Sequence, residues 1–336
     1  MFDRIVFAAT VLLTAGSCAS GARTETADAQ GAEALTPELA ALVAQPQTGS
    51  FNPDTSKDAE FFRNTPERFR PFIAVCNPWD EWDKPAPPFK VHGNTYYVGT
   101  CGIAAILIAG EDGHVLIDGG TEAGGPLIAD SIETLGFAVE DVEYILHSHE
   151  HFDHVAGVAV LQRLSGARLI TSPIAKPVME SGVVDARDPQ AGMHDAFPAA
   201  QVFQTIADGA SVQLGDIEAT AIYTPGHSPG ALSWQWRSCE GEQCYSIVYA
   251  DSLSPVSGDD YKFSEHPDYL AAYHAGLERL GYLDCDILLT PHPSHSRMLK
   301  RMRNDAMIEP TACAYYAIGK NQDIERRLES EAGSNE

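Results

Sequence analysis

The sequence predicts a four-layer α-β-β-α sandwich, an α/β (α+β) fold in which two mixed β-sheets face each other beneath outer helices. Short β-prone segments alternate with segments of helical period in both halves of the chain, as in mixed sheets with packed helices. No linker interrupts residues 70–330, so both halves are expected to form one domain, residues 70–336. Histidines and carboxylates follow several predicted strands, where α/β sheets commonly bind their ligands.

The first half of this domain is expected to begin with two hairpins. Gly93-Asn94 and Glu111-Asp112-Gly113 are turn signals that separate β-prone runs. Apolar residues at helical spacing follow the second hairpin, and a largely apolar strand comes next. The expected elements are strands at residues 89–92, 95–98, 104–109, 114–117 and 142–146, with helices at 126–135 and 155–164.

The second half repeats this alternation and ends in helices. Residues 185–198 show no periodicity and are expected to form a loop. The expected elements are strands at residues 168–171, 201–206, 211–214, 217–223, 231–237, 245–250 and 286–290, with helices at 174–180, 267–280 and beyond residue 296.

The N-terminus resembles a secretory signal within residues 1–30. Its apolar run, residues 5–13, is too short to span a bilayer and is followed by small residues. Cleavage before Cys18 would leave a lipid anchor on that cysteine, and cleavage after Ala29 would release a soluble protein. Both alternatives predict export to the periplasm, with no transmembrane segment in the mature protein.

Residues 31–69 are rich in Ala, Thr, Gln, Pro and Gly and are expected to form a low-complexity tether with one short helix at 37–44. The following segment carries Trp79 and Trp82 among prolines. We expect these tryptophans to pack on the core, and the alternative is that they line the mouth of an active site.

Charge and cysteine content narrow the function further. The formal charge is −25, and no basic run offers a surface for nucleic-acid phosphates, so a nucleic-acid partner is excluded. Of the seven cysteines, six remain after Cys18, and an even set in an exported protein predicts disulfides. The sequence contains no Cys-x-x-Cys pair, so a structural zinc site of that kind is not expected.

A cluster of metal-binding side chains follows the strand predicted at 142–146. Four histidines and two carboxylates lie within eight residues, His147–His154, between that strand and a helix. The spacing His149-x-His151-x-Asp153-His154 directs imidazoles and a carboxylate toward one cavity. Nitrogen and oxygen donors without a thiolate favour a catalytic zinc site over a structural one.

Two more histidines occupy similar positions at the ends of strands. His227 lies between glycine-proline turns in Thr224–Gly230, and His292 follows an apolar strand in Thr290-Pro291-His292-Pro293. A single histidine is more often structural than a ligand, but the shared position at strand ends favours a ligand role for both.

These motifs resemble the metallo-β-lactamase superfamily, and those outside the ligands resemble class B, subclass 3 β-lactamases over about residues 70–320. Asp118-Gly119-Gly120 and Asp251-Ser252-Leu253-Ser254, with no cysteine at the latter site, carry the subclass likeness. The resemblance implies two Zn²⁺ ions, the first held by His149, His151 and His227, and the second by Asp153, His154 and His292. It also implies Asp118 as a buried carboxylate beside the metal loop and the disulfides Cys76–Cys101, Cys239–Cys244 and Cys285–Cys313.

The family likeness implies a hydrolase that opens the β-lactam ring of penicillins, cephalosporins and carbapenems with a zinc-bound hydroxide, conferring antibiotic resistance. Asp153 would be catalytic, orienting the hydroxide and relaying a proton. Ser252 and Ser254 would bind the substrate carboxylate or, alternatively, only cap their turn. The expected partner is a small β-lactam, and the expected state is a monomer.

The alternative is another hydrolase of the superfamily, a lactonase or a thioesterase-like enzyme. In many such relatives an aspartate of the fourth motif bridges the two metals, and Asp251 stands close to that place. A periplasmic zinc-buffering lipoprotein is a third possibility, but it would not need a carboxylate beside histidines in an open pocket.

Overall fold

The computed structural model describes residues 62–76 and 81–333. The expected signal segment with Cys18, most of the 31–69 tether, the helix expected at 37–44, and Trp79 lie outside the described residues. Within the described part of the chain, no helix has the length and apolar character needed to cross a membrane.

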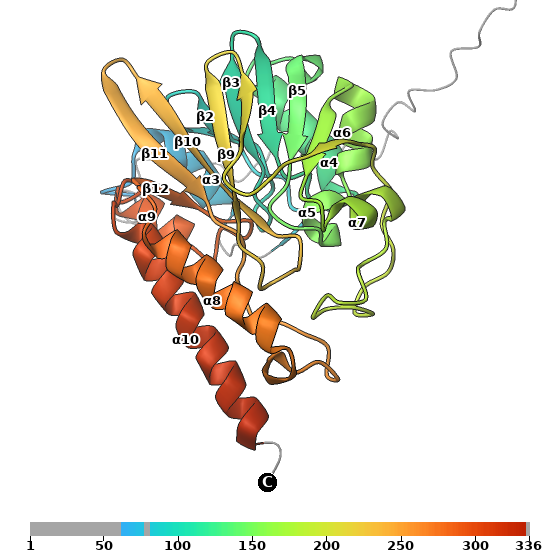
Figure 1. Ribbon diagram of the computed structural model, residues 1–336. Helices are drawn as coiled ribbons and strands as arrows, with labels where there is room; N and C mark the ends of the chain where they lie inside the picture. Colours follow the sequence, from blue (N-terminus) through green and yellow to red (C-terminus); the bar gives the residue numbers. More distant parts are fainter. Residues whose placement is uncertain (1–61, 77–80, 334–336) are drawn as a thin grey trace, which may run out of the picture. The chain divides into compact units, whose positions relative to one another are not determined.

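Two mixed β-sheets form the centre of the described domain (Figure 1). The first has seven strands in sequence order: β1 (Phe89–His92), β2 (Thr95–Tyr97), β3 (Ile106–Gly110), β4 (Gly113–Ile117), β5 (Val142–Leu146), β6 (Arg168–Thr171) and β7 (Val202–Thr205). The strands β1 to β4 pair antiparallel, and β4 to β7 pair parallel. The parallel pairs bring the ends of β4, β5 and β6 to one edge, where the histidine-rich segment His147–His154 begins.

The second sheet has five strands in the spatial order β12-β11-β10-β9-β8. Its strands are β8 (Ser211–Leu214), β9 (Ile217–Tyr223), β10 (Leu232–Glu240), β11 (Gln243–Tyr249) and β12 (Ile287–Leu289). Only β11 and β12 pair parallel, so this sheet is mixed as well.

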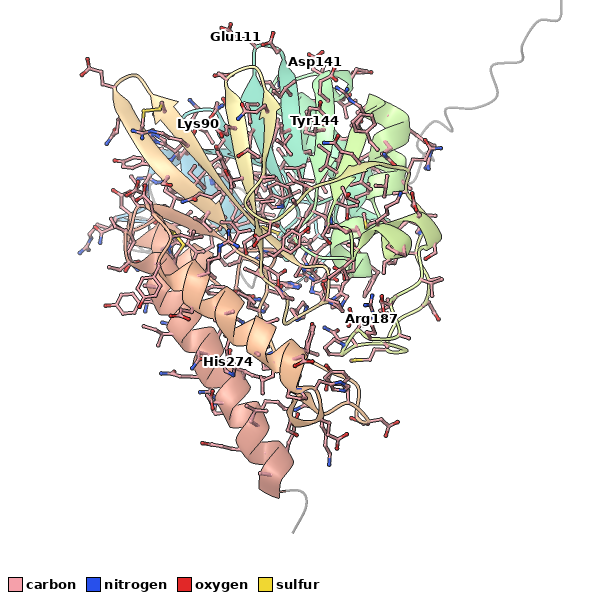
Figure 2. All side chains as sticks on the ribbon, viewed as in Figure 1. Lys90, Glu111, Asp141, Tyr144, Arg187 and His274 are labelled. Carbon is pink, nitrogen blue, oxygen red and sulfur yellow. A yellow bond between two sulfur atoms is a disulfide. The ribbon has the colours of Figure 1, made fainter. Side chains whose placement is uncertain are left out.

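Helices lie outside both sheets (Figure 1). They are α3 (Arg70–Val75), α4 (Gly124–Thr134), α5 (Phe152–Val155), α6 (Val158–Ser165), α7 (Lys176–Ser181), α8 (Pro267–Gly281), α9 (Met298–Arg303) and α10 (Ala312–Gly333), with the 3-10 helices η1 (Glu67–Phe69), η2 (Val139–Asp141) and η3 (Phe263–Glu265). The pair α8 and α10 runs side by side, and His274 of α8, labelled in Figure 2, lies 3.1 Å from Asn321 of α10.

Three clusters of buried apolar side chains fill the spaces between the layers. The largest lies between the sheets and includes Trp234 of β10 and Tyr97 of β2. A second contains Ile128 of α4 with residues of the first sheet. A third joins Leu277 of α8 to Leu288 of β12. Three buried clusters separate four layers of secondary structure, so the predicted four-layer sandwich is confirmed.

The prediction of one helix at 155–164 is wrong at its start, because the chain forms two helices there, α5 and α6. They are separated at Gly157, where a Cβ atom would lie 2.1 Å from the carbonyl oxygen of Gly119. Only glycine permits this close approach of two backbones. The break leaves α5 as a short helix directly after the histidine-rich segment, and this helix carries Asp153 and His154.

Three disulfides connect described residues, and they are the pairs that the family resemblance implies: Cys76–Cys101, Cys239–Cys244 and Cys285–Cys313. The last ties the residues before β12 to α10, so it fixes the C-terminal helix against the second sheet.

Candidate metal centre

The segment that follows β5 carries six buried histidine and carboxylate side chains, between His147 and His154. His149 and His154 are fully buried, and His151 and Asp153 are nearly so. The backbone is extended at His151, and α5 begins at the next residue. This change of direction places the loop histidines and the first-turn residues of α5 around one centre.

Three imidazoles form a first cluster, the His149–His151–His227 trio. Their ligand atoms lie within 4.8 Å of one another. His149 Nε2 is buried and has no hydrogen-bond partner among the described residues. Because an unpaired buried nitrogen is costly, this atom fits a metal ligand.

Each ring of this trio is held through its other nitrogen. His149 Nδ1 lies 2.9 Å from Asp251 Oδ1, and His227 Nδ1 lies 2.8 Å from the carbonyl oxygen of Ser254. His151 Nε2 lies 3.0 Å from Asp188 Oδ2. Such partners fix the tautomer and orientation of metal-binding histidines.

Close packing fixes the backbone beside His227. A Cβ atom at Gly226 would lie 2.4 Å from the ring of Tyr273 on α8, so glycine is required there. Gln190 Nε2 reaches to 3.4 Å from His227 Nε2. The amide of Gln190 therefore lies at the face of the trio, a position that the sequence alone did not indicate.

A second cluster is the Asp153–His154–His292 trio. Asp153 Oδ2 lies 3.0 Å from His154 Nε2 and 3.3 Å from His292 Nε2, and the two nitrogens are 3.3 Å apart. His149 also groups with Asp153 and His154 within 4.8 Å, so the two trios are adjacent. Two nitrogens and one carboxylate oxygen are donors that suit zinc.

The two trios differ in their ionisation. Burial and the neighbouring histidines hold the pKa of His149 and of His227 well below the usual value, so both rings are neutral, as metal ligands must be. Burial opposes charge on His154, but Asp153 and Asp118 raise its pKa to about 10. Burial likewise opposes ionisation of Asp153, but His154 and His292 lower its pKa well below the usual value.

Asp118 supports the second trio from behind. It is fully buried, and its carboxylate accepts hydrogen bonds from Ser148 N at 2.6 Å, Ser148 Oγ at 2.8 Å and Tyr249 OH at 2.7 Å. Its Oδ2 is 3.6 Å from His154 Nδ1. It contacts His154 on the side of the ring away from His292, so it orients the loop instead of joining the trio.

Glu150 connects, through hydrogen bonds, the loop that carries His149 and His151 to the loop that carries His227. Its carboxylate accepts hydrogen bonds from Ser228 Oγ at 2.6 Å and Gly230 N at 2.7 Å. Burial raises the pKa of Glu150 to about 7, against the opposing effect of the Ser228 hydrogen bond. Its position between His149 and His151 is the signal that the sequence offers for this role.

The serine-containing turn lies beside the first trio. Asp251 contacts His149 Nδ1 from behind, and this places it outside the space between the two trios. Ser252 Oγ is buried without a partner among the described residues, and Ser254 is half-buried. His147 is held apart from both trios, because its Nε2 lies 2.6 Å from Thr171 Oγ1.

The expectation that Trp82 packs on the core is wrong. Its side chain is 37% exposed, and its ring centroid lies 5.7 Å from that of His292 and 5.8 Å from that of Phe152. A cavity of about 500 Å³ opens there, lined also by His194. Trp82 therefore forms a wall beside the second trio.

Residues 185–198 cover the same region as a loop, as expected, with Arg187 marking it in Figure 2. This loop supplies Asp188, Gln190 and His194, none of which the sequence indicated as site residues. The lack of periodicity predicts a loop, but it gives no indication of which side chains of the loop are buried or what they contact.

Comparison with known proteins agrees with this architecture. Residues 98–236 match the family model of the metallo-β-lactamase superfamily. The chain is similar to the MIM-2 metallo-β-lactamase, with 53% identity and a TM-score of 0.77 over 80% of this chain and 99% of that one. It is also similar to MEM-A1, a subclass B3 metallo-β-lactamase from a soil metagenome library, with 41% identity and a TM-score of 0.71 over 76% of this chain and 100% of that one.

Curated relatives are more distant. A hydroxyacylglutathione hydrolase of Bradyrhizobium sp. (strain ORS 278) is 32% identical over 111 residues, which cover 33% of this chain and 34% of the relative. The chain spans less than two thirds of the length of the curated relatives that it matches. The identity across nearly the whole of MIM-2 and MEM-A1 decides the family. The chain belongs to the metallo-β-lactamase superfamily as a hydrolase of the metallo-β-lactamase type, and its structural relatives include members of subclass B3.

Proposed function

We propose that the protein hydrolyses the β-lactam ring of penicillins, cephalosporins and carbapenems, using two zinc ions, and thereby confers antibiotic resistance. The observation that carries this proposal is the pair of adjacent trios, one of three imidazoles and one of two imidazoles with a carboxylate. The similarity to MIM-2 and MEM-A1, both named as metallo-β-lactamases, supports the choice of substrate.

His149, His151 and His227 would hold one ion, and Asp153, His154 and His292 the other. In the first set the nitrogens left free are His149 Nε2 and His151 Nδ1. His149 Nδ1 lies 3.1 Å from Ser148 Oγ and 2.9 Å from Asp251 Oδ1, and His151 Nε2 faces Asp188. When bound, zinc supplies a Lewis acid and lowers the pKa of a coordinated water toward neutrality.

Asp153 would accept a proton from the attacking water and later donate it. Its low pKa keeps the carboxylate ionised at neutral pH, as an acceptor must be. The water oxygen adds to the lactam carbonyl carbon, the carbon–nitrogen bond breaks, and the proton held by Asp153 passes to the departing nitrogen. Asp153→Asn should therefore reduce turnover; full turnover with both metals bound would refute this role.

Ser252 and Ser254 would receive the carboxylate of the substrate. Both belong to the turn that ends at the His227 contact, so an anion bound there lies beside the first trio. The buried Ser252 hydroxyl has no partner among the described residues, and this leaves it able to donate to a ligand.

We also propose export to the periplasm, either as a free protein or anchored through Cys18. Three disulfides among the described residues support an oxidising compartment. Fractionation of cells that express the full chain tests the anchor. Membrane association that Cys18→Ser abolishes would support lipidation, and a soluble wild-type protein would refute it.

A thioesterase-like activity is the second candidate, because curated relatives are named hydroxyacylglutathione hydrolases. In the alternative derived from the sequence, Asp251 bridges the metals. Asp251 Oδ1 instead faces His149 Nδ1 at 2.9 Å, on the side of the ring away from His149 Nε2, and this position favours the β-lactamase.

The test is a substrate panel with the zinc-loaded enzyme. One penicillin, one cephalosporin, one carbapenem, a glutathione thioester and a lactone would be assayed with and without a zinc chelator. Turnover of the three β-lactams that the chelator abolishes and Zn²⁺ restores would support the proposal. Preferential turnover of the thioester or the lactone would replace it.

A further inference from the structure

The turn that carries Ser252 and Ser254 is held by two helices. Tyr273 OH of α8 donates a hydrogen bond to the carbonyl oxygen of Leu253. Tyr316 OH of α10 donates to the carbonyl oxygens of Asp251 and Ser252 at 2.9 and 2.7 Å. These contacts are uncharged, and each of them ends on a backbone carbonyl.

One turn farther along α10, Lys320 makes a different contact with the same turn. Its Nζ donates a hydrogen bond of 2.7 Å to Ser254 Oγ. Lys320 is only 8% exposed, and lysine is rarely buried unless it is paired. The carboxylate of Asp323 lies 3.8 Å from Nζ and also pairs with Arg326, so it compensates the buried ammonium only in part.

The Lys320 ammonium also lies over the ring of Tyr316, with Nζ 5.4 Å from the ring centroid. The backbone of Ser254 also accepts the hydrogen bond from His227 Nδ1. A cation therefore lies one hydrogen bond from the hydroxyl of a residue whose backbone carbonyl contacts the first trio.

We propose that Lys320 is a positioning and specificity-determining residue that polarises the Ser254 hydroxyl toward the carboxylate of an anionic substrate. By donating to Ser254 Oγ, the ammonium occupies a lone pair of that oxygen. The hydroxyl hydrogen makes only a long contact of 3.3 Å with the carbonyl oxygen of Ser252, which an incoming anion would replace. A hydrogen bond assisted by charge is stronger than a neutral one. This inference rests on the proposed function, in which the substrate carboxylate reaches Ser254.

A neighbouring cavity offers a rival explanation. It has a volume of about 670 Å³, and Lys320 lines it together with the basic residues Arg297, Lys300, Arg301 and Arg326 and the acidic residues Glu309 and Asp323. A general positive field from this cavity would also attract anions. Lys300 separates the two explanations, because it lines the same cavity without a hydrogen bond to Ser254 among the described contacts.

The experiment measures the preference of the zinc-loaded protein for a carboxylate, independently of turnover. Calorimetry would give Kd for 3-mercaptopropionate and for its neutral analogue 3-mercaptopropionamide, whose thiol groups bind metal equally. We expect the wild type to prefer the acid by about tenfold. Lys320→Met should remove most of this preference, and Lys320→Arg should retain it.

Three further variants separate charge from structure. Tyr316→Phe loosens the same turn without removing a charge and should keep the preference, and so should Lys300→Met. In a Ser254→Ala background, Lys320→Met should have no additional effect. For a β-lactam, Lys320→Met should raise KM more than it lowers kcat.

Equal binding of both thiols by the wild type, or binding of neither, would overturn the proposal. An equal loss of preference in Lys300→Met would assign it to the cavity field, and an equal loss in Tyr316→Phe would assign it to the shape of the turn. A wild type that prefers the acid but hydrolyses no β-lactam would retain the role of Lys320 and reject the proposed substrate.

Discussion

The two trios are built from the same two halves of the chain but are supported differently. Every ring of the His149–His151–His227 trio has its second nitrogen held by a protein oxygen. In the other trio His154 Nδ1 is 3.6 Å from Asp118, and His292 touches the rings of Trp82 and His295 instead. The first trio is therefore the more rigid of the two, and the second is more open to solvent and substrate.

This difference teaches that one ion would be fixed by the protein while the other can adjust to substrate. The side chain of His292 is 14% exposed, whereas that of His149 is fully buried. Ligands held by second partners lose less orientation when a metal leaves. We therefore expect the second trio to release its zinc first.

Loss of a ligand from either trio should have the largest effect. We expect His227→Ala and His292→Ala each to reduce kcat/KM for a β-lactam by at least about a hundredfold, because each would remove a proposed metal ligand. Metal analysis should find about one zinc fewer in each variant. His274→Ala, on α8 and outside both trios, is the control. Retention of two zinc ions by either ligand variant would break the comparison.

Asp118→Asn should have the next largest effect, and it should act on the second trio. The amide cannot accept every hydrogen bond that Ser148 and Tyr249 donate, so the loop before His154 loses its anchor. Zinc affinity of the second trio should fall about 10- to 100-fold. Competition with a chelator measures the zinc affinity of each site. An equal fall at both sites would show that Asp118 does not act on the second trio alone.

Asp188→Asn should have a smaller effect, confined to the first trio. Asp188 contacts His151 through Oδ2 and accepts a hydrogen bond from Gln190 N through Oδ1. Burial opposes charge on the His151 ring, but the hydrogen bond and the charge of Asp188 outweigh it and raise the pKa of His151. Asparagine can still accept a hydrogen bond from His151 Nε2. We expect zinc affinity of the first trio to fall about tenfold. A change at the second trio alone would contradict the assignment.

The smallest effect on activity is expected at Glu331, a carboxylate remote from both trios. Burial opposes its ionisation, but hydrogen bonds from Ser264, Arg327 and Phe263 hold its pKa below the usual value. A lowered pKa gives stability that is present above pH 4.5, the usual value, and lost as pH falls through the folded-state pKa.

Glu331→Gln should therefore lower the free energy of unfolding by about 2 kcal/mol at pH 7 and by progressively less below pH 4.5. Denaturant titrations at several pH values measure this, and metal content should not change. A difference that grows as pH falls would have the wrong sign for this account.

Much of the fold and the grouping of the candidate ligands could be predicted because the signals are local. The strands β5, β6, β8 and β9 begin and end at the predicted residues. Four of the six proposed ligands lie within His149–His154, and His227 and His292 follow apolar strands. Position at a strand end is a local property, so the sequence displays it directly.

The supporting residues could not be predicted, because distant contacts determine them. Asp188 is 37 residues from His151, and it lies in a loop without periodicity. Trp82 and His292 are far apart in the sequence, although their rings lie close together in the structure. Lys320 lies on a helix, where a lysine is ordinarily expected on the solvent face, and only packing against Ser254 shows that it is buried.

The most direct test of the two-trio account is anomalous diffraction at the zinc edge from crystals of the zinc-loaded protein. The account predicts two peaks. One should lie about 2.0–2.1 Å from nitrogens of His149, His151 and His227, and the other at similar distances from Asp153, His154 and His292. A single peak, or a second peak coordinated by Asp251 between the trios, would contradict it.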